Sequence, residues 1–414
     1  MNTDGCLPQN GVPDNAGKGK PLATVLLTTA ACLIYAVNAG IRSNYGIMLN
    51  AISASSGLSY SAVSFVLAVG QLVFGAAQPI FGILALKRSN LFVLCLGAIL
   101  MAGGLMAIPF CSSLWTLIIF LGVVLPSGTG AASFGIIMGV ITPKLSEKSA
   151  STASGFVNAS SGIGNTILSP VIQALIAAGG LIGAMIFLSV PALLILPLSL
   201  WICRPKADRR DGDLRTISGN TGIGALFAEA LRSRAYQFLM IGFFTCGFHM
   251  AIIETHLFTQ ITTYGFSRET AAYAFSIYGF STMVGSVFSG LLCGRVPMQR
   301  VLGSLYGARC VMVALFLLVP KTLLSVCVFT SLLGLTGSAT VPPTAGLVGR
   351  AFGAAKLASL FGFVFFAHQV GSFFSAWLGG VCLALTGEYT LIWCASAVLS
   401  LLASSVSFLI KTKQ

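Results

Sequence analysis

Apolar stretches recur along almost the whole chain and are separated by short polar segments. Each stretch holds about 20 residues, enough to cross the hydrocarbon core of a bilayer as a helix. The pattern predicts helices at 21–49, 60–82, 90–110, 113–141, 149–177, 181–203, 235–263, 269–293, 299–319, 322–345, 356–383 and 388–410. We therefore expect an all-α membrane protein with twelve membrane-spanning helices.

Composition excludes a soluble protein. Of the 414 residues, 56% are hydrophobic and only 8% are charged, whereas a soluble domain carries about 25% charged residues. The apolar run that follows the polar segment 1–20 is too long for a signal-peptide core, so we expect it to remain in the protein. The eleven cysteines show no paired spacing, and we interpret them as small packing residues.

One connection between predicted helices is much longer than the others. Residues 204–234 carry seven basic and four acidic side chains and divide the chain into a half at 21–203 and a half at 235–410. If residues 1–20 and 411–414 are cytoplasmic tails, 19 of the 23 basic residues fall on the cytoplasmic side. This bias predicts that both termini and the linker are cytoplasmic. The net charge of +13 therefore reflects orientation, and we expect no nucleic-acid partner.

The two halves also repeat a short pattern. Residues 82–87 and 290–295 both follow the order Gly-x-Leu-x-x-basic, after the second predicted helix of each half. Two related six-helix halves are the plan of a carrier that works by alternating access, with its site near the bilayer midplane between the halves.

Over residues 21–410 the chain resembles the major facilitator superfamily, since the two Gly-x-Leu loops are similar to its signature. The acidic residue usually found four positions after the glycine is replaced by Leu86 and Gly294. Four further segments resemble the bacterial monocarboxylate-transporter-like branch, namely 42–61, 77–82, 247–257 and 368–380. The resemblance implies two pseudo-symmetric six-helix bundles, the major facilitator fold, and a carrier that is not an enzyme.

Several ionisable residues lie inside the predicted helices. Placing such a charge at the centre of a bilayer costs about 2.5–3.5 kcal/mol on insertion scales, and these residues usually mark a pathway for substrate, ion or proton. They are Arg42, His249, Glu254, His256, Arg309 and His368.

Arg42 is the candidate for binding an anion. Asn38, Arg42 and Tyr45 are spaced at i, i+4 and i+7 of the first predicted helix, which places them on one helix face. An arginine fork can bind a carboxylate through two hydrogen bonds. We interpret the three as an anion clamp. The alternative is an arginine that extends to the outer membrane interface.

His249, Glu254 and His256 are the candidates for proton coupling in the helix predicted at 235–263, and His249 is also a candidate for binding the substrate. The histidines are seven residues apart, on nearly one face, and imidazole titrates near physiological pH. Glu254 points away from that face, so it is either a separate proton site or the partner of another helix. For each of the three, the alternative is a hydrogen bond between helices.

The remaining candidates lie on other helices. By the resemblance, His368 and Gln369 face the central cavity, and His368 is also a candidate proton site. Asn158 lies on the helix at 149–177 and either lines the pore or packs against another helix. Arg309 lies on a helix that the fold places at the periphery, so a structural partner is expected for it. The histidines lack metal-ligand spacing, and no metal or other cofactor is expected.

The sequence therefore predicts a proton-coupled secondary carrier for a small organic anion, a mono- or dicarboxylate, in a bacterial inner membrane. Its partners would be the substrate, protons and membrane lipid, and we expect a functional monomer. One alternative is a proton-driven efflux carrier for a drug or a carboxylate-type siderophore. A distant alternative is a membrane sensor that transports nothing, although the short termini and linker leave no signalling domain.

Overall fold

The computed structural model describes residues 21–204 and 223–411, and nearly all of them are helical. The predicted tail at 1–20, the linker residues 205–222 and residues 412–414 lie outside the described residues. The helices of the N-terminal half are α1 (Pro21–Ser43), α2 (Tyr45–Ser56), α3 (Tyr60–Lys87), α4 (Asn90–Ala107), α5 (Leu114–Leu117), α6 (Leu125–Ala131), α7 (Phe134–Ile141) and α8 (Glu147–Ile202). Those of the C-terminal half are α10 (Arg234–Ile252), α11 (Phe258–Thr263), α12 (Arg268–Cys293), α13 (Met298–Leu318), α14 (Leu323–Thr336), α15 (Val341–Phe352), α16 (Ala354–Thr386) and α17 (Thr390–Phe408).

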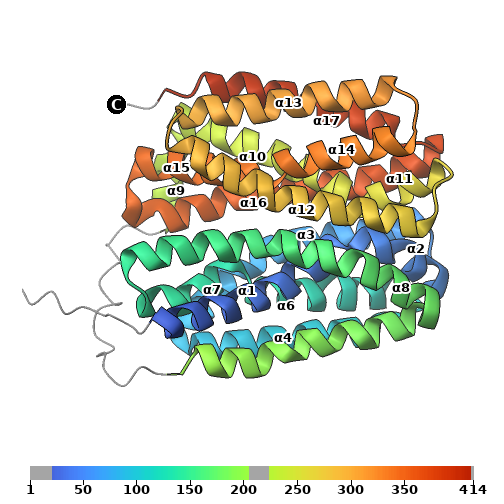
Figure 1. Cartoon of the computed structure of the whole chain (residues 1–414), viewed down its shortest axis with the longest axis horizontal. Helices are drawn as coiled ribbons and strands as arrows, with labels where there is room; N and C mark the ends of the chain where they lie inside the picture. The colour runs from blue at the N-terminus through green and yellow to red at the C-terminus, as the bar shows by residue number, and fades with distance from the viewer. Residues whose placement is uncertain (1–20, 205–222, 412–414) are drawn as a thin grey trace, which may run out of the picture.

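The number of membrane spans agrees with the prediction of twelve. Among the described residues, eleven helical stretches are long and apolar enough to cross a membrane. One of them, Thr152–Ile202, has 51 residues, and at a rise of about 1.5 Å per residue it is more than twice as long as a bilayer core. Within it Gly180 leaves the helical conformation, with φ 63° and ψ −166°. Here α8 turns back on itself, so it supplies two spans (Figure 1).

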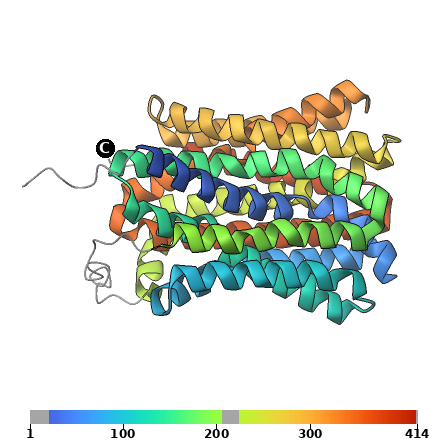
Figure 2. The ribbon, with the colours of Figure 1, turned by 60° about the horizontal axis from the view of Figure 1, so that its bottom comes forward.

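The two halves lie side by side with their helices roughly parallel to one long axis (Figures 1 and 2). At one end, the left in Figure 1, α8 ends and α9 (Ile223–Leu231) begins; we call this the linker end. The opposite end, which we call the distal end, carries α2 and α11. The halves meet where α3 packs on α16, α8 on α12, and α2 on α11 and the segment before it.

The first helix of each half is irregular near its middle. Asn44, with φ −105° and ψ 16°, separates α1 from α2, and its side-chain oxygen accepts a hydrogen bond from the Ser169 hydroxyl at 2.7 Å. In the C-terminal half a π-helical turn, Ile253–Leu257, joins α10 to α11. The two irregular points touch, since a Cβ added to Gly46 would lie 2.7 Å from the carbonyl oxygen of Glu254.

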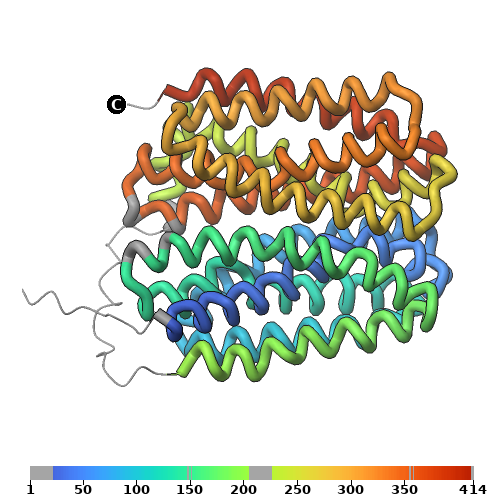
Figure 3. Tube along the Cα trace, viewed as in Figure 1, coloured from blue at the N-terminus to red at the C-terminus, as the bar shows by residue number. Residues whose placement is uncertain are grey.

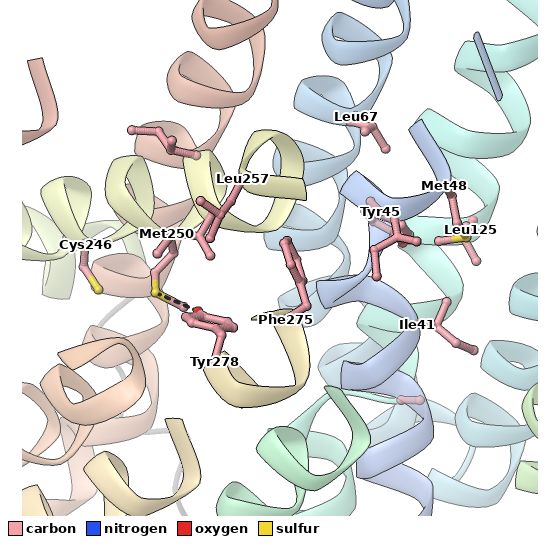
Figure 4. Packing of buried hydrophobic residues seen from close by; sticks show 14 of the residues in the cluster. Ile41, Tyr45, Met48, Leu67, Leu125, Cys246, Met250, Leu257, Phe275 and Tyr278 are labelled. Carbon is pink, nitrogen blue, oxygen red and sulfur yellow. Dashed lines mark hydrogen bonds between the residues drawn. The ribbon is translucent and has the colours of Figure 1, made fainter. Parts of the chain in front are cut away.

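The structure differs from the predicted helix boundaries at several points. The helix predicted at 21–49 breaks at Asn44 and continues to Ser56, where Gly57 ends it with a φ of 72° that favours glycine. The connection predicted at 204–234 contains the short helix α9 (Figure 3). The apolar cores of the halves are otherwise close-packed. Figure 4 shows part of this packing, where the Tyr278 hydroxyl contacts the sulfur of Met250 at 3.5 Å.

Candidate functional site

Arg42 and Glu254 form an ion pair that joins the two halves. Arg42 lies in the last turn of α1, two residues before the break at Asn44, and Glu254 lies in the π-helical turn. Both guanidinium nitrogens face the carboxylate, with Nη1 to Oε2 at 3.2 Å and Nη2 to Oε1 at 3.4 Å. The side chains are 20% and 6% exposed. A pair so deeply buried has lost most of its hydration, so each charge depends on the other.

The surroundings of Arg42 are largely aromatic. Gln71 accepts a long hydrogen bond from Nη1 at 3.5 Å, and the guanidinium carbon lies 4.9 Å from the centre of the Phe74 ring. Phe74 meets Phe365 edge to face at 6.2 Å, and Phe365 stacks on His368 at 5.4 Å. An aromatic row therefore runs from the arginine on α1 to the histidine on α16 and crosses between the halves.

His368 and Gln369 lie at the far end of this aromatic row. His368 is half-buried, and its Nδ1 is 3.4 Å from the Nε2 of Gln369. The Oε1 of Gln369 is buried and has no hydrogen-bond partner among the described residues. The two residues are thus linked to the ion pair through rings rather than through hydrogen bonds. Phe74 was missed by the sequence analysis, although it follows Gln71 by three residues on the same helix face.

In this structure neither Asn38 nor Tyr45 is hydrogen-bonded to Arg42. Asn38 is buried, and its amide donates to the carbonyl oxygens of Thr129 at 3.1 Å and Ala132 at 2.8 Å, where α6 ends. Tyr45 lies beyond the break at Asn44, and its buried hydroxyl has no hydrogen-bond partner among the described residues. Of the three, Arg42 forms the ion pair with Glu254, while the Tyr45 hydroxyl lies close enough to both charges to interact with them electrostatically.

Arg309 has a structural partner, as the sequence analysis expected. Its side chain is fully buried, and Nη2 donates to the carbonyl oxygens of Thr336 and Gly337, the latter at 2.7 Å. These carbonyl groups end α14 where the tenth span breaks before α15. Helix ends leave such groups without intrahelical partners and carry partial negative charge, which a cation stabilises. Arg309 thus supports this break as Asn38 supports the break after α6.

His249 lies within the C-terminal half, away from the ion pair. It is fully buried, its Nδ1 is 2.8 Å from the Ser396 hydroxyl, and its ring meets Trp393 edge-on at 5.8 Å. Its Nε2 has no hydrogen-bond partner among the described residues. The charged group that acts on it electrostatically is Arg309. A second positive charge on His249 would therefore be repelled.

His256 belongs to a set of contacts that closes the distal end. Its Nε2 is 2.8 Å from the carbonyl oxygen of Ala376 on α16, and its Nδ1 is 2.9 Å from the hydroxyl of Tyr60 on α3. The Tyr389 hydroxyl donates to the same Tyr60 oxygen at 2.9 Å. We call Tyr60, His256 and Tyr389 the distal gate, because their hydrogen bonds cross from one half to the other.

Further polar contacts also join the halves. Asn50 on α2 donates to Thr259 on α11 at 3.0 Å, and Asn158 on α8 donates to Ser286 on α12 at 2.9 Å. Asn158 therefore packs one half against the other. No group of three or more possible metal ligands occurs among the described residues.

Comparison with known proteins identifies the family. The model of the Major Facilitator Superfamily matches residues 31–330 and 261–414. The chain belongs to this superfamily. It is 25% identical over 369 residues to the MFS-type transporter YcxA of Bacillus subtilis, covering 85% of this chain and 87% of that protein. It is 24% identical over 380 residues to monocarboxylate transporter 13 of Rattus norvegicus, covering 89% and 84%. It is 26% identical over 329 residues to monocarboxylate transporter 12 of Xenopus laevis, covering 71% and 68%.

A solved structure shows the same fold. The crystal structure of a bacterial homologue of the human lysosomal transporter Spinster, in an inward-facing and unoccupied conformation, superposes with a TM-score of 0.73. It covers 94% of this chain and 97% of that one, at 16% sequence identity. The match to the family model and the relatives named above confirm the resemblance to the superfamily and to its monocarboxylate-transporter-like members and the non-enzymatic nature of the protein, and the shared fold is consistent with twelve helices. The protein is a multi-pass membrane transporter of the major facilitator superfamily.

Proposed function

We propose that this transporter carries a small organic anion together with a proton by alternating access, and that Arg42 holds the substrate carboxylate. The observation that carries the proposal is the ion pair between Arg42 and Glu254. It joins the first helices of the two halves at their irregular points, where carriers of this architecture bind their substrates. A substrate carboxylate has the same shape and charge as the Glu254 side chain, so it can replace that side chain in the arginine fork.

Replacement of Glu254 by substrate explains how a proton would be coupled. Once displaced, the Glu254 carboxylate would be a buried charge without its counter-ion, which is costly. Binding a proton removes that charge, so substrate and proton each favour the binding of the other. Glu254 is therefore our leading proton site. His249 is less well suited, because Arg309 acts on it and no acid is hydrogen-bonded to it. His368 stays a secondary candidate at the end of the aromatic row.

The site favours one carboxylate rather than two. Among the described residues, Arg309 is the other arginine in the middle of a span, and it is engaged with the carbonyl groups at the end of α14. Arg42 alone therefore supplies a cation at the ion pair, beside the apolar face of Phe74. Two relatives are named monocarboxylate transporters, which supports a monocarboxylate as the substrate.

We further propose that the linker end faces the cytoplasm of a bacterial cell and the distal end faces outward across the inner membrane. The excess of basic residues in the segments at the linker end supports this orientation. Both members of the ion pair come from one chain, which suits a functional monomer in membrane lipid.

The proposal is tested by transport in proteoliposomes with radiolabelled lactate, pyruvate, benzoate and succinate, with and without a pH gradient. We expect an inward proton gradient to drive accumulation of a monocarboxylate. Arg42→Ala should abolish binding, and Arg42→Lys should restore it only in part because the planar fork is lost. Glu254→Gln should still exchange substrate across the membrane but should no longer accumulate it. Transport that needs neither side chain, or a substrate without an anionic group, would overturn the proposal.

A further inference from the structure

The hydrogen bonds of the distal gate run in one direction. A carbonyl oxygen only accepts, so the Nε2 that faces the Ala376 carbonyl must carry a hydrogen. In a neutral imidazole the other nitrogen is then an acceptor, and the Tyr60 hydroxyl donates to it. The oxygen of Tyr60 in turn accepts the hydrogen of Tyr389. Every polar atom of the His256 ring is thus satisfied in the neutral form.

The closed gate leaves the His256 ring no freedom to find another partner. The side chain is fully buried, and its ring lies within 6 Å of the rings of Tyr60 and Tyr389, at 5.8 and 5.5 Å between centres. A Cβ added to Gly379 would clash with the ring, so α16 packs directly against the imidazole.

The titratable groups around His256 do not offer it a negative charge. Tyr60 faces it from α3, and Tyr389 faces it from the residue before α17. From α16 it meets a backbone carbonyl group. On its own helix the nearest acid, Glu254, is paired with Arg42. Glu388, next to Tyr389, is exposed and bonded to Thr390.

Protonation of His256 is therefore incompatible with this closed arrangement. With hydrogens on both nitrogens, Nδ1 has to donate, so the Tyr60 hydroxyl must turn its hydrogen away from the ring. That hydrogen then loses the acceptor it has in the gate, and a positive charge is buried without a counter-ion. In an open gate the imidazolium would instead be solvated by water. Closing the gate weakens proton binding to His256, and a bound proton disfavours closure by the same free energy.

We propose that His256 is a second proton-binding site, separate from the Arg42–Glu254 pair, and that a proton bound there holds the distal gate open. Acid on the distal side then favours the conformation open to that side. The inference rests on the proposed function only where the distal end is taken as the outer one. The opening equilibrium itself requires no substrate.

The expected size of the effect follows from proton linkage. A water-exposed imidazole titrates near pH 6.5. If the open gate binds one proton at His256, the population of the open conformation therefore rises below that pH. If the closed gate binds none, the ratio of open to closed molecules rises by about tenfold between pH 7.5 and 5.5.

The test measures this ratio directly. Fluorescent non-natural residues in place of Ala54 and Arg268, both exposed and from opposite halves, would report the width of the distal end by energy transfer in nanodiscs. We expect the wild type to open on acidification without added substrate. His256→Gln should remove this response, because an amide forms hydrogen bonds but does not titrate in this range. His256→Asn should give the same result if the glutamine variant does not fold.

Two matched variants separate this site from the others. His249→Gln replaces another fully buried histidine that bonds within one half, so the acid response should remain. Glu254→Gln tests the ion pair. An acid-induced opening that survives in His256→Gln would overturn the proposal, whether or not it is lost in Glu254→Gln. A wild type that does not open on acidification would overturn it as well. None of these outcomes depends on which substrate is carried, so failure of the proposed function would be recognised separately.

Discussion

Removing one member of the Arg42–Glu254 pair should destabilise the protein more than removing both. Breaking a buried ion pair by deleting one partner costs about 3–5 kcal/mol, because the other charge stays buried alone. The two single variants should differ. Arg42→Gln leaves a carboxylate that is 6% exposed, whereas Glu254→Gln leaves a guanidinium that is 20% exposed and still contacts Phe74 and Gln71. We therefore expect the larger loss, near the upper end of that range, for Arg42→Gln.

The double variant Arg42→Gln/Glu254→Gln completes the comparison. It buries no charge, and the two amides can form a hydrogen bond worth about 1 kcal/mol, so it should be more stable than Arg42→Gln alone. The assay is unfolding in mixed detergent micelles followed by circular dichroism, with all four proteins in one double-mutant cycle. Asn158→Ala, which removes a neutral bond between the halves, is a control for lost inter-half contact without charge. Strictly additive losses in the two single variants would refute the interpretation that the charges depend on each other.

Three further substitutions test the contacts that support the site. Tyr60→Phe removes both hydrogen bonds that cross the distal gate and leaves a His256 nitrogen without its donor. It should shift the equilibrium toward the open gate by about 1–3 kcal/mol, or roughly 5- to 150-fold, and an unchanged distance across the distal end would contradict this. Gly379→Ala should also open the gate, because the added methyl group meets the His256 ring; a closed gate with normal transport would show that the ring can move aside. Arg309→Met should lower thermal stability, since two buried carbonyl groups lose their donor, while Arg309→Lys should recover part of it; equal melting temperatures for both variants would exclude the capping role.

The sequence predicted the helices well because their signal is long and repeated. Twelve apolar runs and the pairing of loops at 82–87 and 290–295 were sufficient to define two halves. What could not be predicted was where a helix departs from regular geometry. Asn44 breaks the first span, so a face counted across that break cannot fix where Tyr45 lies relative to Arg42.

The prediction of which way individual side chains point failed for the same physical reason. Successive side chains of an α-helix are rotated by about 100° about the helix axis. The π-helical turn at Ile253–Leu257 departs from this rotation, so it changes which side chains share a face. His249 and His256, expected on nearly one face, contact different neighbours. The partner of Glu254 could be anticipated only as an unnamed helix, because the pairing with Arg42 depends on how the two halves dock.

The ion pair also constrains how the two halves of this chain can diverge. Arg42 and Glu254 occupy matching irregular points in the first helix of each half, yet they carry opposite charges. Two identical halves would place like charges against each other here. A chain that arose by duplication of one half therefore had to lose its symmetry at this point before the pair could form. Afterwards, a charge reversal on one side is tolerated only together with a reversal on the other, although the two positions are 212 residues apart in the chain.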